Sequence, residues 1–136
     1  MNGSHFSIVQ QSLMRLPYLK MLGFELIFEQ DELTGHLPFA EHLIGNPLVP
    51  ALHGGVIAAL LHFTAAARLM LETEIAGPPR IFTATNEFLA NPQLKASHAS
   101  AKLITRTRRF ANLRAIAWQD DRNFPIAAAT LQFLIA

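Results

Sequence analysis

The chain has 136 residues, of which 51 % are hydrophobic and 15 % are charged, with a formal net charge of +1 and no cysteine. This length is enough for one domain with a hydrophobic core and too short for two, and so few charged residues leave apolar surface that we expect an oligomer to bury. The composition excludes disulfides, zinc–thiolate sites and a thiol nucleophile, and the modest positive charge argues against nucleic acid as a partner.

The N-terminal third predicts a short helix followed by a hairpin. Apolar residues recur at helical spacing over residues 6–16, until Pro17 ends the pattern. From residue 22 the apolar residues alternate with polar ones, which predicts a strand, and the sequence EQDE turns it into a second strand. The N-terminus has neither the basic start nor the continuous apolar stretch of a secretory signal, so we expect a soluble, cytoplasmic protein.

The middle of the chain predicts an irregular segment and then a long helix. Residues 40–52 are rich in glycine and proline, and we expect them to be irregular. The helix predicted from Gly55 to about Leu71 contains no breaker and is apolar on nearly every side, so other structure must enclose it. The apolar run Ala51–Leu61 is shorter than the roughly 20 residues that cross a membrane, and no membrane association is expected.

The remaining sequence predicts three or four strands, each with one face of small and aliphatic residues. They lie in residues 81–90, 94–107 and 109–119 and, after the turn DDRN, in residues 124–135. The order of elements predicts an α+β fold in which an antiparallel sheet wraps around one long central helix.

This order, together with the sequence LHGGVIAALLHFTAAA, resembles the hotdog fold and in particular the PaaI-like acyl-CoA thioesterases. The resemblance extends from about Leu22 to the C-terminus. The segment TATNEFLANP resembles the family's strand that ends Tyr/Phe-Leu-x-Pro, and ITRTRRF resembles its Gly-Arg/Lys turn. The resemblance implies a single hotdog domain over residues 1–136 that hydrolyses an acyl-CoA as a homodimer or a dimer of dimers. Coenzyme A enters as part of the substrate, and no other cofactor is implied.

The His-Gly-Gly sequence suits the role that this resemblance implies. Gly54 and Gly55 at a helix start leave amides unpaired and open, ready to bond the thioester oxygen as it gains negative charge. His53 would lie beside that carbonyl and donate a hydrogen bond or orient the loop. A helix that starts with glycine only for tight packing is the alternative. Asn46 lies one residue out of the spacing at which relatives place an amide side chain against the loop or thioester, and turn chemistry before Pro47 explains it equally.

One expected residue is missing. The resemblance implies an Asp or Glu nine residues after the motif histidine, as nucleophile or activator of water, and nine residues after His53 is His62. His62 is the nearest replacement, because a neutral imidazole can take a proton from water. A core histidine bonded to a backbone carbonyl is the alternative. The serine or threonine that often assists from the next strand falls at Ile81, which cannot assist, and Thr83 is the nearest candidate.

Basic residues concentrate near the C-terminus, where residues 91–136 hold seven Lys and Arg against two Asp and Glu, while residues 1–90 hold four against eight. The resemblance places the phosphates of CoA at the dimer edge, near the turn of the later strands. Arg106, Arg108 and Arg109 are therefore candidates, since the planar fork of arginine can make two hydrogen bonds to phosphate. A solvated strand end is the alternative. Asn91 is a candidate for contact with the pantetheine arm.

Other functions stay open. The sequence HLIGNPLVP is similar to a stretch of the hydroxyacyl-carrier-protein dehydratases, in which His42 would be the base, but the acid that those enzymes need falls at Val56. A protein without the helix carboxylate could also bind acyl thioesters without turnover, because an oxyanion hole alone gives only residual catalysis. A metal enzyme is the weakest alternative, since no two histidines share the i, i+4 spacing with an acid.

Overall fold

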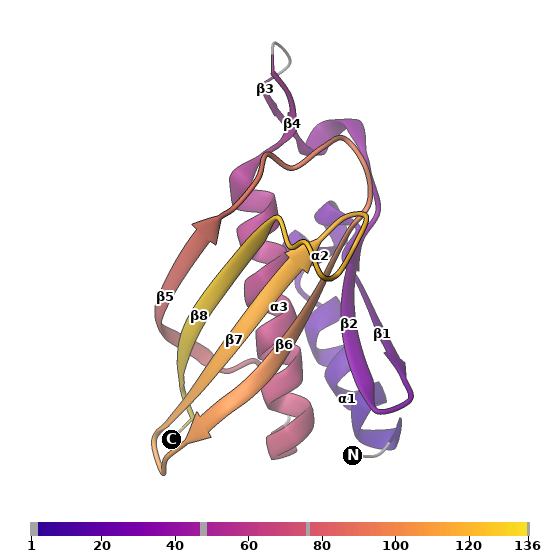
Figure 1. Ribbon diagram of the computed structural model, residues 1–136. Helices are drawn as coiled ribbons and strands as arrows, with labels where there is room; N and C mark the ends of the chain where they lie inside the picture. The colour runs from indigo at the N-terminus through magenta and orange to yellow at the C-terminus, as the bar shows by residue number, and fades with distance from the viewer. Residues whose placement is uncertain (1–2, 47–48, 76, 136) are drawn as a thin grey trace.

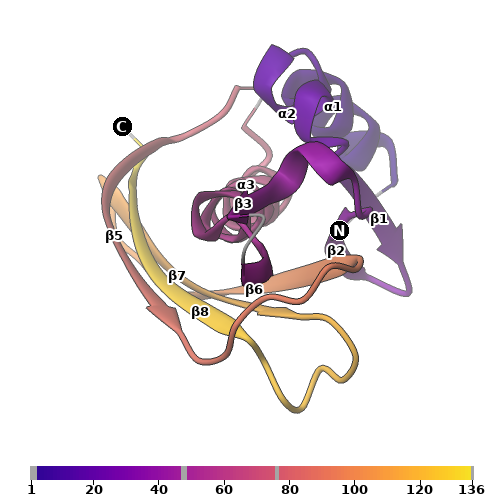
Figure 2. The same cartoon turned by 90° about the horizontal axis from the view of Figure 1, so that it is seen from above.

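The computed structural model describes residues 3–46, 49–75 and 77–135. A six-stranded antiparallel sheet, in the order β1-β2-β6-β7-β8-β5, curves around one long helix (Figures 1 and 2). The helices are α1 (Gly3–Met14), α2 (Pro17–Leu22), the short 3-10 helix η1 (Glu41–Leu43) and α3 (Gly54–Thr73). The strands are β1 (Glu25–Glu29), β2 (Glu32–Leu37), β3 (Ile44–Asn46), β4 (Val49–Leu52), β5 (Arg80–Phe88), β6 (Ser97–Arg106), β7 (Phe110–Trp118) and β8 (Ala127–Leu134).

The concave face of the sheet holds α3, as the sequence predicts. On β7 the inward positions are Ala111, Leu113, Ala115 and Ala117, and all four are fully buried. Small side chains on the strand and on the facing side of the helix allow the two backbones to approach closely, and each fully buried leucine contributes about 2 kcal/mol to stability. The helix packs on β2, β6, β7 and β8, and α1 packs against it as well. This is the hotdog architecture of a long central helix wrapped by an antiparallel sheet.

The helix α3 is long and apolar enough to span a membrane by length and composition alone. Its apolar residues point into the concave sheet, where Leu60, Leu61, Leu69 and Met70 are buried. The sides of the helix that pack on the sheet and on α1 are therefore enclosed inside the fold.

One local prediction is wrong, and one helix was not predicted. Residues 40–52 are not wholly irregular, because η1 is followed by a hairpin in which Ile44 of β3 pairs with Leu52 of β4. In a two-stranded ribbon, one edge of each strand makes no hydrogen bonds to another strand. A proline at such an edge, which has no N–H to donate, therefore loses no hydrogen bond of the ribbon. The first helix ends before Pro17, as predicted, and Pro17 also begins the unpredicted helix α2, where its fixed φ favours the first helical position. Gly23 then ends α2 with a positive φ of 77°.

The strand β5 differs from the strands that cover α3. It forms an edge of the sheet and pairs only with β8, and all nine of its residues are exposed. Figure 2 shows the sheet curving around α3, with β5 at the end of the curve. The fold therefore leaves one side of the central helix accessible, and the candidate site lies on this side.

The tightest contact between α3 and the sheet is made at Gly35 of β2. A Cβ atom added at Gly35 would lie 2.0 Å from Oγ1 of Thr64, so only glycine fits the existing packing. That hydroxyl oxygen is buried and has no hydrogen-bond partner in the described part of the chain. Gly35 and Thr64 thus form one tightly packed pair whose polar atom adds no hydrogen bond.

Candidate active site

The start of α3 is fixed from three sides. The backbone N–H of Leu52 donates to the carbonyl of Pro92 at 3.0 Å, and the N–H of His53 donates to the carbonyl of Leu43 at 2.9 Å. Nδ1 of His53 then accepts the N–H of Gly55 at 2.9 Å, which makes His53 the N-cap of the helix. A side chain that satisfies an otherwise unpaired amide of the first turn stabilises a helix by about 1 kcal/mol.

This cap corrects the prediction that both glycine amides are open. The amide of Gly55 is occupied by the chain's own histidine. The amide of Gly54 donates no hydrogen bond within the described residues, so the helix start offers one amide where two were expected. Since Nδ1 of His53 accepts, the neutral ring carries its proton on Nε2. His53 is exposed, and this Nε2–H group is the donor that the ring retains.

The two glycines differ in what the fold requires of them. A Cβ atom at Gly55 would lie 3.0 Å from Nδ1 of His53, which is too close for the cap to persist unchanged. A Cβ atom at Gly54 would meet only the ring of Phe88, at an ordinary contact distance of 3.7 Å. Glycine at position 55 therefore serves the cap, whereas the protein's own packing would accept alanine at position 54.

An apolar pocket of about 370 Å³ lies on the accessible side of α3. The helix contributes Gly55, Ala58, Ala59, His62, Phe63 and Ala66, and the other walls are formed by Tyr18, Pro78, Pro79, Ile81 and Phe133. His62 is the one imidazole on this wall, and no carboxylate occurs among these residues. A pocket with apolar walls and a single basic group suits an apolar ligand that carries one polar reactive centre.

His62 does not take up the predicted alternative of a bond to a backbone carbonyl. Its Nε2 lies 2.9 Å from Oδ1 of Asn86, which reaches it from β5. Asn86 was missed by the sequence analysis. The available signal was its position in β5. Successive side chains of a strand point to opposite faces of the sheet, so Asn86 faces the helix if Thr85 and Glu87 face outward. Glu87 indeed lies 3.7 Å from Arg114 of β7, on the face of the sheet away from α3.

The other residues predicted at the site are less close together. Thr83 is exposed on β5 and does not line the pocket, while Ile81 does. Asn91 is exposed in the loop after β5 and directly precedes Pro92, whose carbonyl holds Leu52. Asn46 ends β3, but its side chain lies outside the described part of the structure. Contacts of Asn46 and Asn91 with substrate therefore stay predictions.

The predicted base of the dehydratase alternative lies elsewhere. His42 is exposed on η1, and its Nε2 donates to the carbonyl of Met21 at 2.7 Å. It does not line the pocket that contains His62. Nothing in the structure therefore favours the dehydratase interpretation.

The arginine cluster lies at the other end of the molecule. Arg106 ends β6, and Arg108 and Arg109 form the exposed turn into β7, which Figure 1 places at the opposite end from the start of α3. The carbonyl of Arg109 accepts the N–H of Ile135, which ties the turn to the C-terminal end of β8. Within one chain the cluster is thus remote from Gly54.

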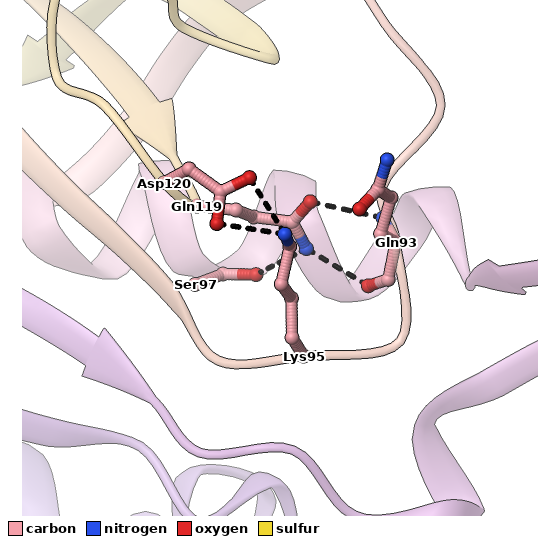
Figure 3. A network of polar contacts seen from close by, with 5 residues as sticks. All are labelled: Gln93, Lys95, Ser97, Gln119 and Asp120. Carbon is pink, nitrogen blue, oxygen red and sulfur yellow. Dashed lines mark hydrogen bonds and ion pairs between the residues drawn. The ribbon is translucent and has the colours of Figure 1, made fainter.

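A network of amide groups supports the loop between β5 and β6 (Figure 3). Oε1 of Gln119 accepts the N–H of Gln93 at 2.9 Å, and its Nε2 donates to the carbonyl of Gln93 at 2.8 Å and to Oγ of Ser97 at 3.1 Å. Nζ of Lys95 bonds both carboxylate oxygens of Asp120. This loop contains Pro92, whose carbonyl accepts the N–H of Leu52, so the network also stabilises the start of α3.

Two histidines lie side by side on the outer face of the sheet. Nδ1 of His36 and Nδ1 of His98 are 2.9 Å apart, and His98 also packs against Trp118. Burial, together with the charge of His36, lowers the pKa of His98. Among the residues that the structure describes, no three His, Asp or Glu side chains are arranged to hold a metal ion.

Known proteins resemble this chain in sequence and in fold. A search of proteins with curated functions finds no significant match. A crystal structure from Chromobacterium violaceum is 28 % identical, with a TM-score of 0.74 over 98 % of this chain and 97 % of that one. A Ralstonia eutropha protein, named as a thioesterase and as phenylacetic acid degradation-related, is 20 % identical, with a TM-score of 0.79 over 96 % and 99 %. A Bacillus halodurans protein crystallised with CoA is 16 % identical, with a TM-score of 0.76 over 100 % and 95 %.

The family comparison covers most of the chain. The family model of the acyl-CoA thioesterase N-terminal domain matches residues 46–134, which run from the end of β3 to the end of β8 and include the His-Gly-Gly turn, α3 and Asn86. The structural relatives share the hotdog arrangement over nearly their whole length. The chain is therefore a member of the acyl-CoA thioesterase family, with the PaaI-like hotdog fold that its sequence resembles.

Proposed function

We propose that this protein hydrolyses an acyl-CoA thioester, with His62 in the place of the usual helix carboxylate. The observation that carries the proposal is the position of His62, which lies on the wall of an apolar pocket that begins at Gly55, at the start of α3. Apolar walls suit the acyl group, and the imidazole is the one basic group that the pocket-lining residues supply.

The chemistry requires one donor and one base. The amide of Gly54, at the positive end of the α3 dipole, bonds the thioester oxygen as charge develops on it. Neutral His62 takes a proton from water while the water oxygen attacks the carbonyl carbon. The tetrahedral intermediate then expels the CoA thiolate and forms the carboxylic acid, and the thiolate takes the proton that His62 received from water. A thiolate is a good leaving group, so little acid assistance is needed.

A homodimer through β5 would complete the site. An exposed edge strand is a template for pairing with another chain, and the rings of Phe82 and Phe88 on β5 are 61 % and 52 % exposed. Antiparallel pairing of two β5 strands about a two-fold axis reverses the direction of the second subunit. The β6–β7 turn of one subunit then lies at the end where α3 of the other begins.

This arrangement would bring the arginine turn to the nucleotide of the substrate. Arg106, Arg108 and Arg109 form no ion pair within the described residues, so their guanidinium groups are available for the phosphates of CoA. The related Bacillus halodurans protein was crystallised with CoA, which supports this class of ligand. CoA lying across the dimer edge would place the thioester in the pocket along α3.

The test compares hydrolysis of a panel of acyl-CoAs by wild type, His62→Ala and Gly54→Ala. Removing a general base typically costs about 10²- to 10⁴-fold in kcat. A methyl group at position 54 fits the fold but stands beside the donor amide, and a displacement of about 1 Å can cost 100-fold. Wild-type activity should also fall at acidic pH, because His62 must be neutral. Activity that survives in His62→Ala, or a flat profile between about pH 5 and 8, would contradict the assignment of the base.

A second function is favoured by two observations. The pocket-lining residues include no carboxylate, and the Gly55 amide is already bonded, so the site has less catalytic equipment than the resemblance implies. The protein would then bind acyl-CoA without hydrolysing it. Absence of turnover in wild type and His62→Ala alike, with a rise in thermal stability on addition of acyl-CoA, would establish this function instead.

A further inference from the structure

We propose that Asn86 is a positioning residue that holds His62 in a single tautomer, with the proton on Nε2 and the lone pair on Nδ1. The identity of His62 as the base rests on the proposed function. The tautomer does not rest on it, because it follows from the hydrogen bond between the two side chains.

The hydrogen bond determines which nitrogen is basic. Oδ1 of Asn86 lies 2.9 Å from Nε2 of His62, and a carboxamide oxygen can only accept. Nε2 is therefore the donor, and Nδ1 is left to take a proton from water. A histidine base is useful only in the tautomer that aims its lone pair at the reaction, and the wrong tautomer can cost about 10⁴-fold in kcat.

The backbone of β5 keeps Asn86 in place. Asn86 pairs with Ala129 of β8, and its neighbours Thr85 and Glu87 pair with Thr130 and Ala128. This register extends through Phe88, whose ring lies 3.7 Å from the position that a Cβ of Gly54 would occupy. One strand therefore positions both the partner of His62 and the ring beside the donor amide.

Charge distinguishes this pair from a carboxylate–histidine pair. Among the residues that line the pocket, the ionisable side chains are His62 itself and Tyr18 from α2, while Glu87 pairs with Arg114 on the outer face. The carboxamide orients the imidazole without adding a negative charge, which would favour the protonated ring. Asn86 thus provides the orientation that an aspartate would provide without placing a negative charge beside His62.

The experiment records nitrogen-15 NMR spectra of the histidine rings together with pH profiles of kcat and KM. The proteins are wild type, Asn86→Ala, Asn86→Asp and the control Thr85→Ala, which alters the neighbouring outward residue. The signals of His62 are identified by their loss in His62→Gln. Wild type and Thr85→Ala should show a protonated Nε2 at neutral pH, and Asn86→Ala should show a mixture of the two tautomers.

The kinetics then separate positioning from a general structural role. Asn86→Ala should lower kcat about 10- to 100-fold at unchanged KM, which is the loss seen when the outer hydrogen-bond partner of a metal-bound histidine is removed. Asn86→Asp should restore the Nε2–H tautomer and move the acid limb of the profile to higher pH, because the carboxylate favours the imidazolium. Thr85→Ala should match wild type in both readouts.

Several results would overturn the proposal. A protonated Nδ1 in wild type, or a tautomer that does not change in Asn86→Ala, would show that Asn86 does not hold the ring. A changed tautomer with unchanged kcat and pH profile would show that the pair has no catalytic consequence. If wild type hydrolyses no acyl-CoA, the spectra alone still decide whether Asn86 fixes the ring, and the proposed hydrolysis fails separately.

Discussion

Replacement of Gly35 by alanine should destabilise the protein chiefly through its contact with Thr64. The new Cβ would lie 2.0 Å from Oγ1 and 3.2 Å from Cβ of Thr64, and 3.2 Å from Cε2 of Phe24, whereas real Cβ contacts closer than 3.0 Å essentially do not occur. The strand and the helix must therefore separate by about 1 Å, and such overpacking of a core costs about 1–3 kcal/mol. For a domain of this size, that loss lowers the melting temperature by roughly 3–12 °C.

Thr64→Ala provides the matching change on the helix. Because the Thr64 hydroxyl has no hydrogen-bond partner within the described residues, the single substitution loses only packing, at about 1 kcal/mol. In the double variant the Cβ of residue 35 takes the space of the missing oxygen. The double variant should therefore be more stable than the sum of the single effects by about 1–2 kcal/mol.

Chemical denaturation of the four proteins at one fixed protein concentration measures this coupling. The fixed concentration matters because association of subunits would add to the apparent stability. Additive single effects would refute the reasoning, since they would show that the new methyl group does not meet Thr64. A Gly35→Ala variant as stable as wild type would refute it more directly.

Three further outcomes are expected. His53→Ala should lower the free energy of unfolding by about 1 kcal/mol. His53→Asn should retain most of the stability that the cap provides, because asparagine also caps helices. Urea denaturation at constant pH tests both variants. The lowered pKa of His98 means that the unfolded chain takes up the proton first as pH falls, so wild-type stability should decline below about pH 6.5. His98→Gln should decline less over this range and His42→Gln as much as wild type, and an equal decline in His98→Gln would contradict the assignment. A double change of Arg108 and Arg109 to alanine should weaken the binding of CoA and reduce the salt dependence of that binding. Calorimetry at two ionic strengths measures both effects, and the control Arg15→Ala should change neither.

The fold was largely predictable because its main elements follow from single periodicities. The apolar run after Gly54 predicts an enclosed helix, and the small inward residues of β7 and β8 predict the sheet that encloses it. The hairpin of β3 and β4 is not predicted, because proline and glycine usually indicate irregular structure, whereas a two-stranded ribbon tolerates them at its free edges.

The site was less predictable because its key contacts join residues that are distant in sequence. His62 was found by its spacing from His53, but its partner Asn86 lies 24 residues further on, in a strand whose alternation gives no sign of chemistry. The cap at Gly55 was missed because histidine is not among the residues that commonly cap helices. Spacing along the chain shows which groups exist, and only the fold shows which of them are already bonded to one another.

The carboxamide of Gln119 pairs with the backbone of Gln93 as a peptide unit of a neighbouring strand would. Its oxygen accepts the N–H of Gln93, and its nitrogen donates to the carbonyl of Gln93. Of the amino-acid side chains, only asparagine and glutamine can do this, and asparagine is one methylene group shorter. Conversion of this amide to an acid, as happens when proteins age, would remove both donated bonds and set a negative charge against the carbonyl oxygen of Gln93. A chemical change of a single group, at the far end of β7, would thereby loosen the loop against which Leu52 and the first turn of α3 are braced.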